Sequence, residues 1–262
     1  MELDDIRKHW EQAGERLSMT DVVTPTSRDP HLGRLEQSNI LNLLKGDQDV
    51  LEIGCGDAQH TVRYARQVKS ILGLDVAASL IRLAERRAAT EGLKNVHFNC
   101  RSVLHMTPLG EETFDCVISQ RCLINLPTWQ HQREALEQIF RTLKPGGLFL
   151  MTEGFEEELQ ELNRARHAVG LTEVQVVSYN RNLRHSEFDV FVRTLFDIEA
   201  VKDYGLYLFC SRVFHPIAVR PEQPRHDSHL NEAAAVLASA GLGVSMKQYS
   251  YNLMYVLRKQ HS

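Results

Sequence analysis

The chain has 262 residues, of which 43% are apolar, and 30 Lys and Arg residues against 34 Asp and Glu residues give a formal net charge of −4. This composition excludes a wholly disordered chain, and no apolar run reaches the ~18 residues that a membrane helix needs. A slightly acidic chain without a basic run does not favour a nucleic-acid surface. Because the N-terminus lacks a signal-peptide pattern, we expect a cytoplasmic protein without nucleic-acid or membrane partners.

Helical and strand patterns alternate from the N-terminus through the middle of the chain. Helical patterns cover 1–18 and 31–45, joined by a turn-rich segment at 24–30. Short apolar segments then predict strands at 49–53, 70–75, 95–100, 114–119 and 148–152, and helical patterns lie between them at 58–68, 79–91 and 129–143. This alternation predicts right-handed βαβ units, and therefore a parallel sheet with helices on both faces.

The C-terminal part of the chain adds two further strands and a long excursion. The patterns predict helices at 155–169 and 187–195, strands at 196–201 and 251–258, and an Ala-rich helix near 230–241 within the excursion 204–250. The five cysteines contain no Cys-x-x-Cys pair, so neither a disulfide framework nor a zinc site is indicated. We therefore expect one α/β domain with a seven-stranded, mostly parallel sheet and helical additions.

The most informative stretch is Val50-Leu-Glu-Ile-Gly-Cys-Gly-Asp-Ala-Gln59, where a strand runs into Gly54-x-Gly56 and a helix follows. Glycines allow a sharp turn and the close approach of a ligand. Glu52 lies near the strand end, and Asp75 ends the next strand, where an acid accepts hydrogen bonds from ribose hydroxyls. The spacing predicts a nucleotide-type cofactor. A dinucleotide fingerprint requires a third glycine where this chain has Gln59.

The pattern Glu-x-Gly-x-Gly, the acidic strand end Leu74-Asp75, the strand entry Phe114-Asp115 and the run Leu143-Lys-Pro-Gly-Gly-Leu148 together resemble class I SAM-dependent methyltransferases over about 49–155. The resemblance implies the Rossmann-like fold of that class and S-adenosyl-L-methionine (SAM) as cofactor, with S-adenosylhomocysteine as product. Two positions depart from the family pattern. The loop has Ala58 in place of a third glycine, and Arg101-Ser102-Val103 stands where the family often has an acid.

The resemblance also implies a role for individual residues. Residues at the strand ends would hold the methionine part of SAM, the ribose and the adenine. The methionine part would contact Glu52, Gly54, Gly56 and Gln120, the ribose would contact Asp75, and the adenine would contact Val76, Ser102 and Val103.

The acceptor is expected outside the carboxyl ends of the strands, where the added segments begin. We expect 1–45 to be a helical N-terminal lid, 49–155 the SAM-binding core, 156–195 and 204–250 insertions that cover the substrate, and 251–258 the last strand, all in one domain 1–262. Polar residues of these walls are the substrate-binding candidates, since guanidinium groups bind oxyanions bidentately. They are Arg121, Asn163, Arg166, Tyr179, Asn180 and Arg212.

Methyl transfer to an amine needs no base, whereas transfer to a hydroxyl needs one within hydrogen-bond reach. The candidate bases are His185, His215 and Glu153, and no metal site is predicted. The sequence thus predicts methyl transfer from SAM to an O or N atom of a small metabolite or sugar, either anionic or neutral. Two alternatives remain open at this point: an NAD(P)-dependent Rossmann oxidoreductase and a non-catalytic SAM-binding protein.

Overall fold

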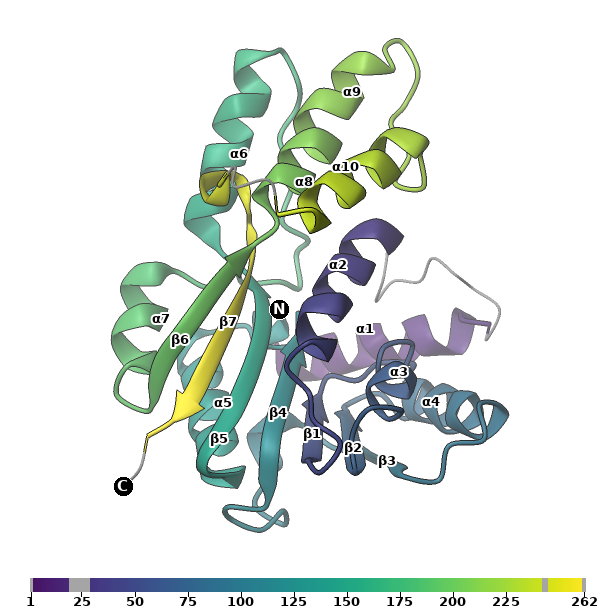
Figure 1. Ribbon diagram of the computed structural model, residues 1–262, viewed down its shortest axis with the longest axis vertical. Helices are drawn as coiled ribbons and strands as arrows, with labels where there is room; N and C mark the ends of the chain where they lie inside the picture. The colour runs from purple at the N-terminus through teal and green to yellow at the C-terminus, as the bar shows by residue number, and fades with distance from the viewer. Residues whose placement is uncertain (1, 19–28, 242–244, 261–262) are drawn as a thin grey trace.

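The computed structural model describes residues 2–18, 29–241 and 245–260 of the chain. At its centre lies one seven-stranded sheet in the order β3-β2-β1-β4-β5-β7-β6, in which β7 runs in the opposite direction to the other six strands (Figure 1). The strands are β1 (Asp49–Ile53), β2 (Ser70–Asp75), β3 (Val96–Cys100), β4 (Phe114–Gln120), β5 (Leu143–Gly154), β6 (Phe196–Asp203) and β7 (Asn252–Lys259). The expected seven-stranded, mostly parallel sheet is confirmed.

Helices flank this sheet and extend beyond it. They are α1 (Leu3–Arg16), α2 (Pro30–Leu41), α3 (Thr61–Tyr64), α4 (Ala78–Thr90), α5 (Trp129–Thr142), α6 (Glu156–Ala168), α7 (His185–Val192), α8 (Gly205–Phe209), α9 (His215–Ala218) and α10 (His229–Ser239). Side-chain caps start several of them; Asp29 accepts the N–H groups of His31 and Leu32 at the start of α2, and Thr128 accepts that of His131 in α5. None of the described helices is long and apolar enough to span a membrane.

Two apolar cores lie on opposite faces of the sheet, because successive strand residues point to opposite sides. In β4, Val117 belongs to the core that α5 and α7 cover. Its neighbours Cys116 and Ile118 belong to the core that α2, α3 and α4 cover. This alternation gives the layered α/β architecture.

The expected elements are present, but several differ in extent; the helix expected at 31–45, for example, ends at Leu41. The helix expected at 58–68 is helical only over Thr61–Tyr64, since the glycine loop occupies its first residues. The strand expected at 148–152 begins at Leu143, so the Pro-Gly-Gly run lies within β5 and accompanies a register shift against β4. The turn-rich segment expected at 24–30 lies, apart from its last two residues, outside the described residues.

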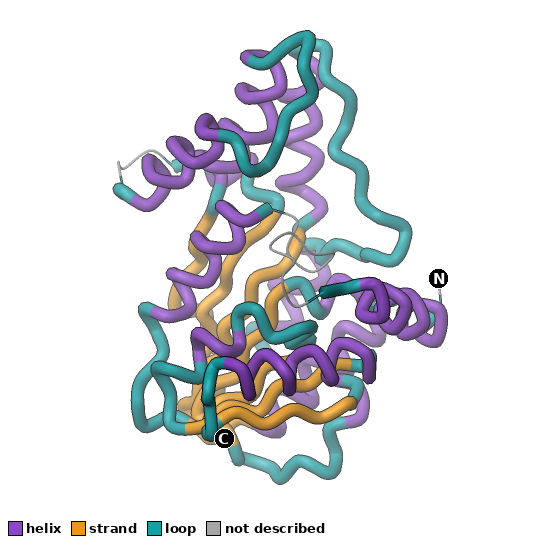
Figure 2. Tube along the Cα trace, turned by 90° about the vertical axis from the view of Figure 1, so that its right-hand side faces the viewer, coloured by secondary structure: helices purple, strands orange, loops and turns teal. Residues whose placement is uncertain are grey.

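A helical layer made of α6, α8, α9 and α10 stands over the carboxyl ends of β5 and β6 (Figures 1 and 2). A loop over 169–184 connects α6 to α7 and runs back down toward the sheet (Figure 2). The additions to the core therefore gather at the edge of the sheet where parallel α/β folds bind ligands.

Candidate active site

The loop after β1 carries three residues in the left-handed backbone region. Gly54, Gly56 and Ala58 have φ angles of 67°, 55° and 62°. The Asp75 carboxylate at the end of β2 accepts the N–H of Gly56 at 3.0 Å and that of Ala77 at 2.9 Å. The end of one strand thus holds the loop that follows its neighbour, because parallel strands end at the same edge.

A cavity of about 470 Å³ opens between this loop and α1. The residues that the sequence assigned to the cofactor all line it, and so do Arg121, Tyr179 and Asn180 from the predicted substrate set. The cofactor residues in the wall are Glu52, Gly54, Gly56, Asp75, Val76, Ser102, Val103 and Gln120. The structure therefore brings together residues from the ends of β1, β2, β3 and β4.

Two acids, Glu52 and Asp75, and the amide of Gln120 lie in the wall of this cavity. Burial, with the charge of Asp75 adding to it, raises the pKa of Glu52 to about 7, and burial raises the pKa of Asp75 to about 6. One carboxylate oxygen of Glu52, Oε2, and the amide nitrogen of Gln120 have no hydrogen-bond partner among the described residues. Tyr64 donates its hydroxyl to the other end of that amide, Gln120 Oε1, at 2.6 Å.

Several residues of this cavity were not singled out from the sequence. His60, at the end of the glycine loop, lies with Nδ1 3.1 Å from Gln120 Oε1, and burial lowers its pKa to about 4. The sequence feature that could have identified His60 is its position at the start of a helix directly after the glycine loop. Helix α1 forms another wall with Leu3, Ile6 and Trp10, and the indole of Trp10 donates to Asn125 Oδ1 at 3.0 Å.

A second cavity of about 770 Å³ adjoins the first, and the two share Arg121, Ile124, Tyr179 and Asn180 in their walls. It lies under the helical layer, and Arg166, Arg212 and His215 from that layer also line it.

Arginines in the second cavity differ in how their charge is balanced. Arg212 donates to Asp29 Oδ2 at 2.6 Å, and Tyr207 donates to the other oxygen of that carboxylate at 2.7 Å. Arg121 is ion-paired with the fully buried Glu36 and has a φ of 55°, in the left-handed region.

Arg166 carries the least balanced charge of the three. It donates to the backbone carbonyls of Thr172 and Arg212, and it has no carboxylate partner among the residues described. Burial and the adjacent charge of Arg212 lower the pKa of Arg166. A guanidinium in this setting favours an anion from outside the chain.

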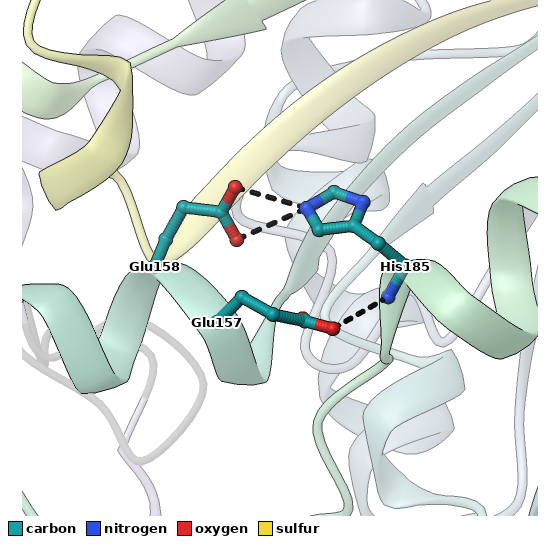
Figure 3. Close-up of side chains that lie close together, drawn as sticks. All are labelled: Glu157, Glu158 and His185. Carbon is teal, nitrogen blue, oxygen red and sulfur yellow. Dashed lines mark hydrogen bonds and ion pairs between the residues drawn. The ribbon is translucent and has the colours of Figure 1, made fainter.

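Three predicted residues lie outside both cavities. Asn163 exchanges hydrogen bonds with the backbone of Val174 and so fastens the 169–184 loop to α6. Glu153, buried in β5, accepts the hydroxyl of Ser119 at 2.6 Å and the N–H groups of Cys122, Leu123 and Ile124. Its carboxylate therefore supports the turn after β4. His185 lies at the start of α7, where Nε2 contacts the carboxylate of Glu158 in α6 (Figure 3) and Nδ1 contacts that of Asp189 in α7.

His215 is the one predicted base that lines either cavity. Only 2% of its surface is exposed, and burial together with the charge of Arg212 lowers its pKa, which favours the neutral imidazole. Its Nδ1 is buried without a hydrogen-bond partner among the described residues.

Comparison with known proteins agrees with this geometry. Residues 50–147 match a family model described as a methyltransferase domain. An uncharacterised methyltransferase of Bacillus subtilis, YdaC, is 30% identical over 116 residues, which cover 44% of this chain and 60% of that protein. The first three curated relatives are matched over 60%, 15% and 46% of their lengths, so the shared part is the domain and not the whole of those proteins.

Solved structures show the same fold at low sequence identity. A SAM-dependent methyltransferase from Methanosarcina mazei has a TM-score of 0.58 and 18% identity, covering 86% of this chain and 98% of that one. The N-methyltransferase NodS from Bradyrhizobium japonicum, in complex with S-adenosylhomocysteine, has a TM-score of 0.53 and 15% identity, covering 97% of this chain and 99% of that one.

Fold, loop and family match define the class: the chain contains a class I SAM-dependent methyltransferase domain. SAM is the cofactor of this enzyme class, and the open alternative of a nicotinamide-dependent oxidoreductase is not supported.

The polar groups that line the first cavity fit this cofactor independently of the comparisons with other proteins. The unpartnered oxygen of Glu52 suits the ammonium group of the methionine part of SAM, and the unpartnered amide nitrogen of Gln120 suits its carboxylate. A cationic ligand beside Glu52 and Asp75 also offsets the cost of burying two ionised acids. The polar groups in the cavity wall are therefore complementary to a ligand that carries an ammonium group, a carboxylate and a net positive charge.

Proposed function

We propose that this chain transfers the methyl group of SAM to an oxygen or nitrogen atom of a small anionic acceptor. The observation that carries the proposal is the junction of the two cavities at Arg121, Ile124, Tyr179 and Asn180. A cofactor in the first cavity and an acceptor in the second would meet there. The arginines of the second cavity, Arg166 above all, supply positive charge for a carboxylate or phosphate.

We assign the cofactor contacts as the sequence suggested. Glu52 and Gln120 bind the polar end of the methionine part, Asp75 accepts the ribose hydroxyls, and Val76, Ser102 and Val103 surround the adenine. When bound, SAM supplies a methyl group activated by a sulfonium. The chain's own part is to hold the acceptor in line with that methyl group and to exclude water, which is how the covering helices contribute to the rate.

We assign His215 as the base for a hydroxyl acceptor. A neutral imidazole accepts the proton that the hydroxyl loses as it attacks the methyl carbon, whereas an amine acceptor needs no such group. His215 lines the second cavity, and its Nδ1, which has no hydrogen-bond partner among the described residues, is the nitrogen in question.

We further propose that the whole chain is one domain in which 1–45 and the insertions 156–195 and 204–250 form the walls around the substrate. The second cavity, with its arginines, suits a small molecule in the site and not a nucleic-acid backbone along an open surface.

The experiment that tests the function is turnover of methyl-labelled SAM by the full chain against matched acceptors. The panel pairs each carboxylate or phosphate compound with its neutral ester or amide, and calorimetry measures SAM binding in parallel. We expect turnover only with the anionic members. Tight SAM binding without any turnover across the panel would instead support a non-catalytic SAM-binding protein.

A further inference from the structure

A compact group of metal-ligating side chains lies away from both cavities, where α6 and α7 begin. Glu157 and Glu158 belong to the first turn of α6, and His185 is the first residue of α7. The imidazole Nε2 lies 2.9 Å and 3.2 Å from the two oxygens of Glu158, and the backbone N–H of His185 donates to Glu157 Oε1 at 3.0 Å (Figure 3). One potential ligand atom from each residue lies within 4.8 Å of the others.

Contacts with Asp189 and Phe155 fix the orientation of the His185 imidazole. Its Nδ1 lies 3.0 Å from Asp189 Oδ2, and Tyr255 donates its hydroxyl to the other oxygen of Asp189, also at 3.0 Å. The ring stacks on Phe155 with centroids 4.7 Å apart. A histidine that ligates a metal almost always donates its other N–H to a carboxylate in this way, which fixes the tautomer and directs the free nitrogen.

Two further observations indicate that the group favours a cation. Glu157 Oε2 is buried and has no hydrogen-bond partner among the described residues. The three carboxylates around one imidazole also leave the cluster with excess negative charge.

We propose that Glu157, Glu158 and His185 bind one divalent transition-metal cation. One imidazole nitrogen with two carboxylate oxygens is a ligand set that suits Zn²⁺ and Co²⁺, with water completing the coordination. The cation would take the place of the proton between Nε2 and Glu158. Its role would be structural: it would join the start of α6, the helix that carries Arg166, to the start of α7.

The test uses the full chain, free of any affinity tag and stripped with a chelator, titrated with Co²⁺ alone and followed by visible absorption and calorimetry. We expect one Co²⁺ per chain and a higher melting temperature when it is bound. Glu157→Gln and Glu158→Gln should each weaken binding by about tenfold or more. Glu161→Gln is the matched control, because Glu161 lies on the same helix, exposed and paired with Arg164.

His185→Gln provides the third ligand variant, and its melting curve without metal shows whether it folds. The proposal is overturned if the wild-type chain shows no saturable Co²⁺ binding, or if binding persists unchanged in Glu157→Gln and Glu158→Gln. In either case the cluster is an ion pair that holds the two helices without a metal.

Discussion

Gly56 donates its backbone N–H to the carboxylate of Asp75 over 3.0 Å, so the residue that is assigned to the ribose also holds the loop that is assigned to the methionine part. The ribose contact and the conformation of the glycine loop therefore depend on the same carboxylate. A change at Asp75 therefore affects both the ligand contact and the shape of the loop, and its effects have to be separated by measuring binding and stability together.

Asp75→Ala should weaken SAM binding by roughly 30- to 100-fold, because two charge-assisted hydrogen bonds to the ribose are lost. It should also cost about 1–3 kcal/mol of stability, since the N–H groups of Gly56 and Ala77 lose their acceptor. Calorimetry and urea unfolding measure the two effects. Asp115→Ala is the control, because Asp115 likewise accepts a backbone N–H, that of Asp49, near the amino ends of the strands. Unchanged SAM affinity in Asp75→Ala would refute the cofactor assignment.

Gly54→Ala should abolish SAM binding and destabilise the fold. The sequence suggested that a side chain here would block the ligand, but the structure shows that a Cβ would first meet the side chain of Cys122, at 2.7 Å from its Cβ. Gly92→Ala is a matched control, because Gly92 has the same φ of 67° and nothing within 4 Å of the added atom. Gly92→Ala should lower the free energy of unfolding by only ~1 kcal/mol, which is the cost of the left-handed conformation for a residue with a Cβ atom. Equal losses in the two variants, measured by thermal unfolding, would contradict the crowding argument.

SAM affinity should rise with pH by about tenfold between roughly pH 6 and 8. Burial raises the pKa of Glu52 to about 7, and a bound ammonium group favours its ionised form, so binding releases a proton below that pH. Stability of the free protein should show the opposite trend. Because the pKa of Glu52 in the fold lies above its usual 4.5, the folded state retains a proton that the unfolded state loses, and stability falls from about pH 4.5 to 7.

Calorimetry across this pH range checks the trend in affinity, and Glu52→Gln should flatten most of it. The remaining slope in that variant should belong to Asp75, whose pKa is about 6. A wild-type affinity that is constant from pH 6 to 8 would show that Glu52 does not face the cationic part of the cofactor.

Arg166→Gln should raise the KM for an anionic acceptor by roughly tenfold or more, because the variant loses a charge-assisted hydrogen bond from a guanidinium that has no carboxylate partner among the described residues. SAM affinity should be unchanged, since Arg166 lines only the second cavity. Arg164→Gln is the matched control, on the same helix but exposed and paired with Glu161. An identical KM in Arg166→Gln and Arg164→Gln would place the acceptor elsewhere.

His215→Gln should lower kcat for a hydroxyl acceptor by about 100-fold, the lower range for general-base catalysis, and leave SAM affinity unchanged. The pH profile of kcat distinguishes a base from a packing residue, because its acidic limb should disappear in the variant. His229→Gln is the control, since His229 is fully exposed on α10. A variant that keeps both kcat and the acidic limb would exclude His215 as the base.

The cofactor half of the site was readable from the sequence because its parts are local. Glu52, Gly54 and Gly56 lie within one strand-to-helix turn, and Asp75 ends the next strand. Since neighbouring parallel strands end at the same edge, the order of elements alone placed these residues together. The predicted strands and most helices followed for the same reason, because their periodic patterns report burial directly.

Only the tertiary structure decided the rest, because the deciding contacts join distant parts of the chain. Glu36 binds both Arg121 and Asn252, 216 residues further on, and Arg166 meets the backbone of Arg212 across 46 residues. Long charged side chains are common at solvent-exposed positions. A sequence pattern therefore does not distinguish those that line a cavity from those that are exposed to solvent. His185 shows the same limit: next to Glu158, 27 residues away, it becomes part of a cluster that no spacing rule would have identified.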